Sequence, residues 1–199
     1  MSILIIAEHD NNNLKGSTLN TIAAGKLITG DITLLIAGSN IENVINESQS
    51  LDGVTNILKC DDPGFENLLA EDLSDLVLSV ASDFTHILAP ATTFGKNLMP
   101  RISAKLDTQQ ISDIISIESD DTFKRPIYAG SCIATVKSSD AIKVITVRST
   151  AFDPATQSSN SANINEIGAI SSKGNSKYIS EELAQSDRPE LTADRKSVV

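Results

Sequence analysis

The chain has 199 residues, of which 40% are hydrophobic, so it is long and apolar enough for one domain with a buried core, and disorder is excluded as its default state. Only 4% of the residues are aromatic and there is no Trp, which leaves Ile, Leu, Val and Ala to build a core of the kind found in parallel sheets covered by helices. The formal net charge of -10 repels phosphate backbones and anionic lipid, which argues against nucleic-acid and membrane-surface functions.

The first half of the chain alternates between short apolar runs and helical patterns. The runs at 3–7, 33–37, 54–58 and 86–89 predict strands, and the patterns at 17–30, 41–51, 69–80 and 99–106 predict helices. We expect Ser17 to cap the first helix and Gly30 to end it. The apolar face of that helix is formed by Leu19, Ile22, Ala23 and Leu27. Pro100 is tolerable only near the start of its helix.

The pattern changes after residue 110. Strand-like runs at 111–117, 127–136 and 142–147 follow one another without helices between them, which predicts an antiparallel extension on one edge of the sheet. Residues 153–174 lack periodicity and predict a long connection, and 179–186 predict one short helix that Arg188-Pro189 ends. Together these elements predict a three-layer α/β/α sandwich with a mostly parallel sheet, similar to the adenine-nucleotide-hydrolase fold.

The segment from Ala89 to Lys96 follows a predicted parallel strand and enters a helix, the position where open α/β sheets receive ligands or partners. As a phosphate loop it fails twice, because Pro90 replaces the leading glycine and Asn97 stands where a Ser or Thr would bind magnesium. Two hypotheses stay open. The segment is either a binding loop or a tight structural turn whose threonines cap the next helix.

No residue pattern points to catalysis or to a metal. His9 and His86 are the only histidines and lack a ligand pattern, so we expect His9 to stabilise a turn. Cys60 and Cys132 predict two buried thiols rather than a disulfide. There is no G-x-G-x-x-G and no G-x-S-x-G. We therefore predict no catalytic residue, no metal ligand and no enzyme activity of the chain's own.

The segment from Arg125 to Gly130 combines a guanidinium, a rigid proline and an amphipathic tyrosine, a set suited to a protein interface or an anion contact. The alternative is a strand entry at which Arg125 is merely solvated. The predicted interface residues are Thr93, Lys96, Arg125 and Tyr128.

Nine segments stand together in the order found in one family: 6–9, 18–21, 37–40, 86–96, 111–113, 122–123, 125–130, 146–148 and 186–191. In these segments the chain resembles the alpha subunit of electron-transfer flavoproteins, up to Thr192. The resemblance implies a heterodimer of alpha and beta subunits that hold one FAD. It further implies that electrons pass from acyl-CoA and related dehydrogenases, as in fatty acid beta-oxidation, to a membrane quinone oxidoreductase and the respiratory chain.

The resemblance places most FAD contacts in a C-terminal domain that begins soon after Arg188–Thr192, where this chain instead reads Ala193 to Val199. We therefore divide it into an α/β domain at 1–187 and a truncated stub at 188–199. No flavin-contacting residue is carried over, and we expect the chain alone to bind no FAD.

Two rival functions remain, a stand-alone nucleotide-binding α/β module and a non-redox scaffold. The chain opens into a strand without a basic leader, and no apolar run approaches the roughly 20 residues of a membrane helix. We expect no direct membrane insertion, and a location in the bacterial cytoplasm, or in the mitochondrial matrix if a leader was removed.

Overall fold

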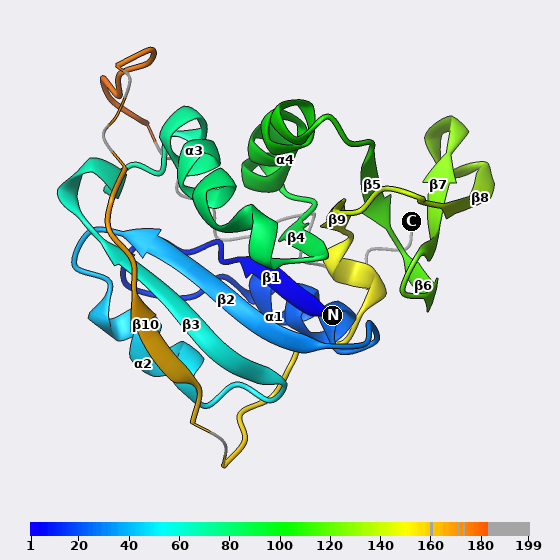
Figure 1. Ribbon diagram of the computed structural model, residues 1–199, viewed down its shortest axis with the longest axis horizontal. Helices are drawn as coiled ribbons and strands as arrows, with labels where there is room; N and C mark the ends of the chain where they lie inside the picture. Colours follow the sequence, from blue (N-terminus) through cyan, green and yellow to red (C-terminus); the bar gives the residue numbers. More distant parts are fainter. Residues whose placement is uncertain (160, 171, 173, 183–199) are drawn as a thin grey trace.

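Seven parallel strands form the central sheet of the computed structural model, which describes residues 1–159, 161–170, 172 and 174–182 (Figure 1). Their order is β10-β3-β2-β1-β4-β9-β5, and every neighbouring pair runs parallel. The strands are β1 (Ser2–Ile6), β2 (Asp31–Gly38), β3 (Val54–Asp61), β4 (His86–Pro90), β5 (Gln110–Ile114), β9 (Lys143–Val147) and β10 (Asn163–Glu166).

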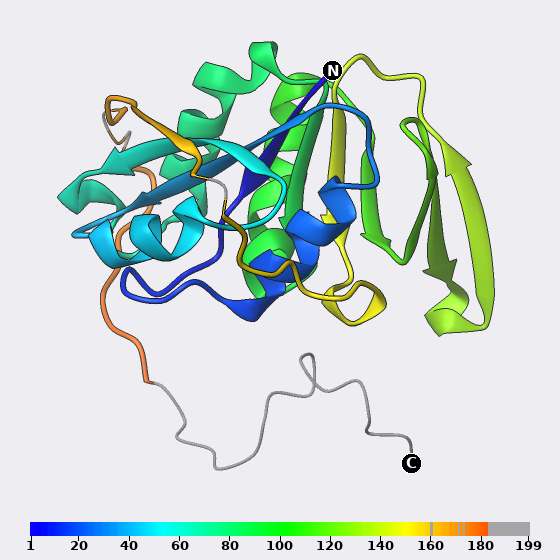
Figure 2. The same cartoon turned by 90° about the horizontal axis from the view of Figure 1, so that it is seen from below.

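Helices cover both faces of this sheet, which confirms the predicted three-layer sandwich (Figures 1 and 2). The helices are α1 (Gly16–Gly25), α2 (Glu42–Gln49), α3 (Ala70–Val80) and α4 (Thr93–Leu106). Side chains alternate between the two faces of a strand, so Ile3 and Ile5 pack with α1 and α2 whereas Leu4 and Ile6 pack with α3 and α4. Both sides of β1 are therefore buried, as its continuous apolar run predicts.

Helix α1 differs from its prediction in its start, its end and its buried face. The Ser17 hydroxyl donates to Glu8 and forms no cap. The helix approaches the sheet along Gly25, where a Cβ would lie 3.0 Å from an isoleucine side chain of β1. The helix ends at Gly25, so Leu27 lies beyond it and is 59% exposed, whereas the predicted face residue Ile22 is fully buried. Gly30, with φ of +135°, forms the turn into β2 instead of ending the helix.

Helix α4 begins at Thr93, so Pro100 lies in its middle and the expectation of a position near the start is wrong. Pro100 is exposed, which puts the missing backbone hydrogen bond on the solvent side of the helix. Close packing at the start of α4 fixes how the chain passes from β4 into the helix. A Cβ on Gly95 would lie 1.9 Å from the Pro90 carbonyl oxygen, so only glycine fits this turn from β4 into α4.

The antiparallel extension is a separate sheet of three strands, β6 (Ser116–Ser119), β7 (Thr122–Ile127) and β8 (Cys132–Lys137). The predicted run at 111–117 divides into β5 and β6, and a turn at Tyr128–Gly130 divides the run at 127–136 into β7 and β8. The run at 142–147 does not join the extension. It returns to the main sheet as β9, parallel to and between β4 and β5.

Asp120, in the turn between β6 and β7, attaches the small sheet to the main body. Its carbonyl lies 2.7 Å from His86 Nε2 at the start of β4, and its carboxylate accepts a 2.7 Å hydrogen bond from the Thr29 amide. Phe123 of β7 is completely buried in the core on the α1 side. The small sheet is thus fixed to the body at its root.

The long connection after β9 runs along α2 to the opposite edge of the sheet. Backbone hydrogen bonds tie it down on the way, from Asp52 N to Thr156 O at 2.9 Å and from Ala162 N to Gln49 O at 2.8 Å. It then forms β10 beside β3, a strand that the sequence does not predict. For the helix predicted at 179–186, residues 179–182 are not helical, and the rest lies outside the described residues. In the described part of the chain, no helix is long and apolar enough to cross a membrane.

Replacing Gly95 by alanine is expected to lower the free energy of unfolding by about 2–4 kcal/mol, because the new methyl group would overlap the Pro90 carbonyl. Gly16→Ala is the matched control. No atom lies within 4 Å of its Cβ position, and its effect should stay within about 0.5 kcal/mol. Urea denaturation followed by circular dichroism measures both. Equal stabilities would contradict the close approach at Gly95.

The stability of the fold should fall as the pH is lowered through the range in which histidine titrates. Burial lowers the pKa of His86 below its ordinary value of 6.5. The unfolded chain therefore binds a proton more readily there, and the stability is lost as pH falls from about 6.5 toward the folded pKa. His86→Gln should show a shallower decline in urea denaturation across this interval. An unchanged slope would show that His86 does not contribute.

Candidate functional site at the carboxyl ends of the strands

The direction of chain crossover reverses between β1 and β4. From β1 the chain passes to β2 on one side, whereas β4 lies on the other side of β1. In open parallel sheets the crevice beyond the carboxyl ends at such a point is the usual ligand position. Here the position is bordered by Glu8 after β1, by the start of α1, and by Thr92 after β4.

The Glu8 carboxylate lies at this position and is held from both sides. Its Oε2 atom accepts hydrogen bonds of 2.9 Å from both Ser17 Oγ and Thr92 Oγ1. The Glu8 backbone is also held, since its amide donates to Thr18 Oγ1 at 2.9 Å. A phosphate needs N–H donors and positive charge at this place, whereas Glu8 supplies a negative charge. The arrangement disfavours the stand-alone nucleotide-binding module.

The loop between β4 and α4 is a tight turn that presents Thr93 and Lys96 to solvent. Its backbone is fixed by hydrogen bonds from Ala91 N to Val147 O at 2.7 Å and from Lys96 N to Thr92 O at 2.9 Å. Thr92 occupies the N-cap position, but its hydroxyl donates to Glu8, so the expected side-chain cap is absent from this end of α4. Lys96 forms no ion pair with any residue that the structure describes.

His9 stabilises the turn after β1, as predicted. Its Nδ1 accepts a 3.0 Å hydrogen bond from the Asn11 amide, so the neutral ring carries its proton on Nε2. Nε2 is buried, and burial lowers the pKa of His9, an effect that the backbone of Ala37 partly opposes. Among the described residues, no group of three His, Cys, Asp or Glu side chains could hold a metal ion.

The two cysteines lie in different environments. Cys60 is buried in β3, and burial raises the pKa of its thiol to about 11. Cys132 is exposed, so the expectation of two buried thiols is wrong for it. The reason is geometric: Cys132 opens β8 opposite Ile127, at the end of the small sheet farthest from its buried root, where the strands cover no core.

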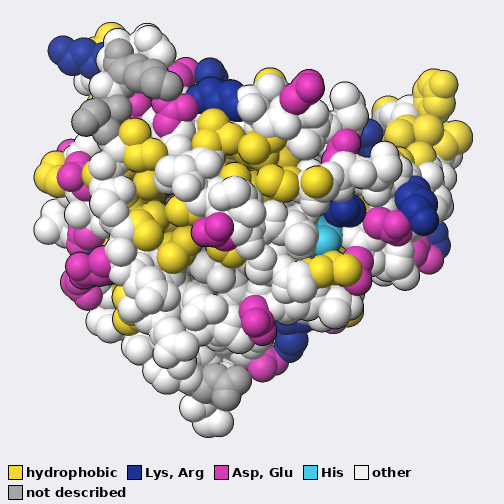
Figure 3. Space-filling model, viewed as in Figure 1, with side chains coloured by type: hydrophobic (Ala, Val, Ile, Leu, Met, Phe, Trp, Pro, Cys, Tyr) yellow, Lys and Arg dark blue, Asp and Glu magenta, His cyan; other side chains and the backbone are white. Residues whose placement is uncertain are grey.

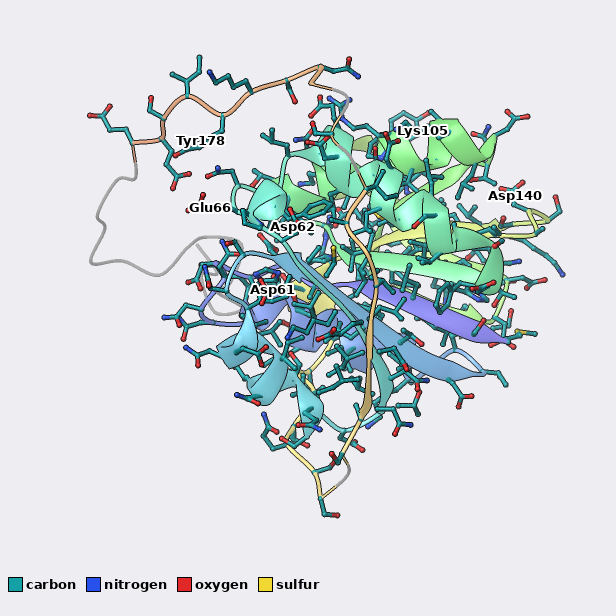
Figure 4. All side chains as sticks on the ribbon, turned by 60° about the vertical axis from the view of Figure 1, so that its left-hand side comes forward. Asp61, Asp62, Glu66, Lys105, Asp140 and Tyr178 are labelled. Atoms are coloured by element: carbon teal, nitrogen blue, oxygen red, sulfur yellow. The ribbon has the colours of Figure 1, made fainter. Side chains whose placement is uncertain are left out.

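Acidic side chains gather at the carboxyl end of β3. Asp61, Asp62 and Glu66 lie there together (Figure 4). Two of them hold turns, since Asp61 accepts from the Asn40 amide at 2.7 Å and Asp62 from the Gly64 amide at 2.8 Å. The neighbouring pocket is lined by Asp62, Gly64, Phe65, Asp72, Ala169, Ile170 and Ser172. Two carboxylates in its wall make it a poor place for a phosphate.

Arg125 and Tyr128 lie at the far end of β7. Arg125 is half-buried, its Nη2 donates to Ser112 Oγ at 3.3 Å, and its Nε is buried without a partner in the described structure. Tyr128 is 79% exposed. The turn at residues 128–130 lies at the same end of the molecule as residues 149–151, which follow the carboxyl end of β9 (Figure 2).

Sequence reasoning missed the ion pair between Arg148 and Asp113. Arg148 Nε lies 3.1 Å from Asp113 Oδ1, and Nη2 donates to the second carboxylate oxygen, so the contact is bidentate. This contact raises the pKa of Arg148. Asp113 adopts φ of +60°, and its amide donates to Thr146 Oγ1 at 2.8 Å. Both residues stand near the ends of predicted strands, but only the insertion of β9 beside β5 reveals that they meet.

The four predicted interface residues therefore form two pairs. Thr93 and Lys96 lie at the start of α4, and Arg125 and Tyr128 lie on the β7–β8 hairpin. Among the described residues, no hydrogen bond or ion pair links one pair to the other. Their role in an interface stays a prediction.

A family model and three known relatives all match this chain to one protein family. A family model described as the electron transfer flavoprotein domain matches residues 3–172. The electron transfer flavoprotein subunit alpha of Pseudomonas aeruginosa is 49% identical over 97% of this chain and 62% of its own length. The mitochondrial alpha subunit of Dictyostelium discoideum is 46% identical over 96% of this chain and 59% of its own. That of Paracoccus denitrificans is 41% identical over 100% and 64%. The chain spans about three fifths of these relatives.

A double-mutant cycle tests the Glu8 clasp, by which we mean the hydrogen bonds from Ser17 and Thr92 to the Glu8 carboxylate. Glu8→Ala and Thr92→Val should show a coupling energy of about 1–2 kcal/mol, because a hydroxyl donates to a charged carboxylate. Glu8→Ala with Thr135→Val, an exposed residue of β8, is the control and should couple by less than about 0.3 kcal/mol. Urea denaturation of the four proteins in each cycle gives these values. Equal coupling in both cycles would show that the clasp does not form.

Proposed function

This chain belongs to the electron transfer flavoprotein family, and we propose that it acts as the N-terminal α/β domain of an alpha subunit in a heterodimeric electron carrier. In this proposal the assembly takes electrons from acyl-CoA and related dehydrogenases and delivers them to the respiratory chain through a membrane quinone oxidoreductase. The beta subunit is the direct partner. In this proposal the chain helps to build the heterodimer and carries out no catalytic step of its own.

The match to alpha subunits carries this proposal. The identity of 49% to the Pseudomonas aeruginosa protein extends over 97% of the chain, so it includes the loops at the carboxyl edge as well as the core. A shared fold alone would not support a function, because many functions occur on one α/β architecture. Similarity across loops and hairpin is stronger support, since these are the parts that contact partners.

The described residues do not fit the pyrophosphate of FAD. A pyrophosphate is held by amide donors at a helix start, often with positive charge nearby. Here the starts of α1 and α4 both face the Glu8 carboxylate, and the pocket beside β3 contains Asp62 and Asp72. We therefore propose that the flavin contacts lie outside the described residues. Residues 188–199, which lie outside the described part, are proposed to begin the flavin-binding portion.

The relatives also support a proposal on location. They include a bacterial protein and a protein named as mitochondrial. We propose the bacterial cytoplasm, or the mitochondrial matrix, as the place where the chain works.

Two purifications test the proposed function. The chain expressed alone should be colourless and lack flavin absorbance, because its described surface opposes a pyrophosphate. Expressed with the beta subunit from the same genome, it should co-purify with that subunit. The Pseudomonas aeruginosa alpha subunit with its own beta subunit is the flavin-positive control. Tightly bound FAD at one equivalent in the isolated chain would contradict the placement of the flavin, and failure to co-purify would contradict the alpha-subunit role.

A further inference from the structure

The edge strand β10 and the residues that follow it are held to the body by few buried contacts. We call residues 163–170 the strap, which consists of β10 and the next four residues. All four residues of β10 are exposed, and the strand pairs on one side only, in parallel with β3. A parallel edge strand that buries no side chain has little besides its backbone hydrogen bonds to keep it in place.

The attachments at the two ends of β10 differ in depth. Ala162, just before the strap, lies within the core, and its amide donates to Gln49 O at 2.8 Å. At the other end, the Ile167 amide donates to Lys59 O at 2.9 Å, and the Ile167 side chain packs half-buried at the surface of the core on the α3 side. Ala162 is therefore the firm attachment, whereas the contacts of Ile167 can break at the surface of the molecule.

The ion pair between Lys59 and Glu166 holds β10 from the side. Lys59 Nζ lies 3.7 Å from Glu166 Oε1, and it also donates to the Glu42 carboxylate of α2. The Glu166 side chain is 80% exposed, so water competes for it and the pair contributes little. Because Lys59 keeps Glu42 as a partner, the release of Glu166 leaves no buried charge uncompensated.

The strap covers a pocket of about 290 Å³ at the carboxyl end of β3. The wall of this pocket combines Phe65 and Asp72 of the body with Ala169 and Ile170 of the strap. From β10 the chain runs toward α3, where the Ser176 hydroxyl donates to the Glu71 carboxylate at 2.9 Å (Figure 1). Figure 3 shows hydrophobic side chains gathered on this face in the area between β10 and α3. If the strap lifted, the pocket would lose one wall and this part of the core would meet water.

The body keeps its own contacts when the strap lifts. Strand β3 is paired with β2 from Val54 to Asp61, and its Ile57 side chain is completely buried on the α2 side. Opening therefore exposes one strand edge and one corner of the core, a small area beside that exposed by global unfolding. Openings that break few buried contacts occur at free energies well below that of global unfolding.

We propose that residues 163–170 open and close as a strap over the pocket beside β3, and so control access to Phe65 and Cys60, while the rest of the main sheet stays folded. Phe65 and Cys60 belong to the core on the α3 side, against which Ile167 and Ile170 of the strap pack. The opening needs no partner, because the contacts that it breaks lie at the surface of this chain.

Hydrogen–deuterium exchange of the full chain, followed by mass spectrometry, tests the opening. Peptides that cover residues 163–167 should exchange at least about 100-fold faster than those that cover 33–36 in β2, at a rate that low concentrations of urea leave unchanged. Glu166→Gln should speed exchange of the strap about two- to fivefold, and Ile167→Ala about tenfold. Exchange in β2 should stay as in the unmodified chain.

Glu118→Gln and Ile133→Ala are the matched controls, since they make the same chemical changes on the small sheet. Glu118 pairs with Lys124 at 3.1 Å, and Ile133 is 53% exposed. Neither control should change the exchange of residues 163–167.

Labelling of Cys60 tests the control of access. With Cys132→Ser, Cys60 is the sole thiol of the chain. Because Cys60 is 1% exposed, methyl methanethiosulfonate should reach it only when the strap is open. Ile167→Ala should then speed the labelling of Cys60 by the same factor as it speeds the exchange of residues 163–167.

Two results would overturn the proposal. If residues 163–167 exchange at the rate of residues 33–36 and respond to urea in the same way, the strap opens only when the whole chain unfolds. If the strap exchanges early but Cys60 is labelled only at the rate of global unfolding, the strap does not control access to the pocket. Neither result bears on the alpha-subunit role, which co-purification with the beta subunit tests separately.

Discussion

The Glu8 carboxylate receives hydroxyl hydrogen bonds from Ser17 at the start of α1 and from Thr92 before α4, so it joins helices on opposite faces of the sheet. This contact lies at the point where an open parallel sheet of this kind ordinarily receives a phosphate-bearing ligand. A carboxylate held there by two hydroxyl groups gives the crevice a negative charge. The same contact turns the loop after β4 into a fixed surface feature, with Thr93 and Lys96 on its outside. The fold thus keeps the frame of a nucleotide-binding sandwich and presents an edge suited to assembly.

The position of the small sheet follows from the order of the strands in the main sheet. Because β9 inserts beside β5, the three antiparallel strands between them must leave the main body and return. They do so as an arm that is buried at its root and exposed at its tip. The arm is neutral overall, with three acidic and three basic residues in 116–137, and it exposes apolar groups at its tip, whereas the body is acidic. We therefore propose that the buried core of the body stabilises the fold, whereas the arm, which carries Arg125 and Tyr128, contacts the partner subunit.

Much of the fold follows from local pattern. Continuous apolar runs such as Ile3–Ala7 predict strands buried on both faces, and the spacing of Leu73, Leu76 and Val77 predicts a helix against them. The errors arise where tertiary contacts decide. Gly25 and Gly95 are ordinary glycines in the sequence, yet Gly95 is required by its close approach to the Pro90 carbonyl and Gly25 packs tightly against the Ile5 side chain. The insertion of β9 is non-local, so neither the ion pair of Arg148 with Asp113 nor the exposure of Cys132 is visible in the pattern. Residue types alone indicated the loop and the hairpin as candidate contacts. The positions and exposure of their side chains are known only from the structure.

Hydrogen–deuterium exchange of the chain, alone and mixed with the beta subunit, tests the central claim most directly, because it locates contact by residue on the intact protein. The account predicts slower exchange at residues 125–133 in the mixture and no change around Glu8 when FAD or ATP is added. Slower exchange around Glu8 with either nucleotide, or protection by the beta subunit confined to β3 and β10, would contradict it.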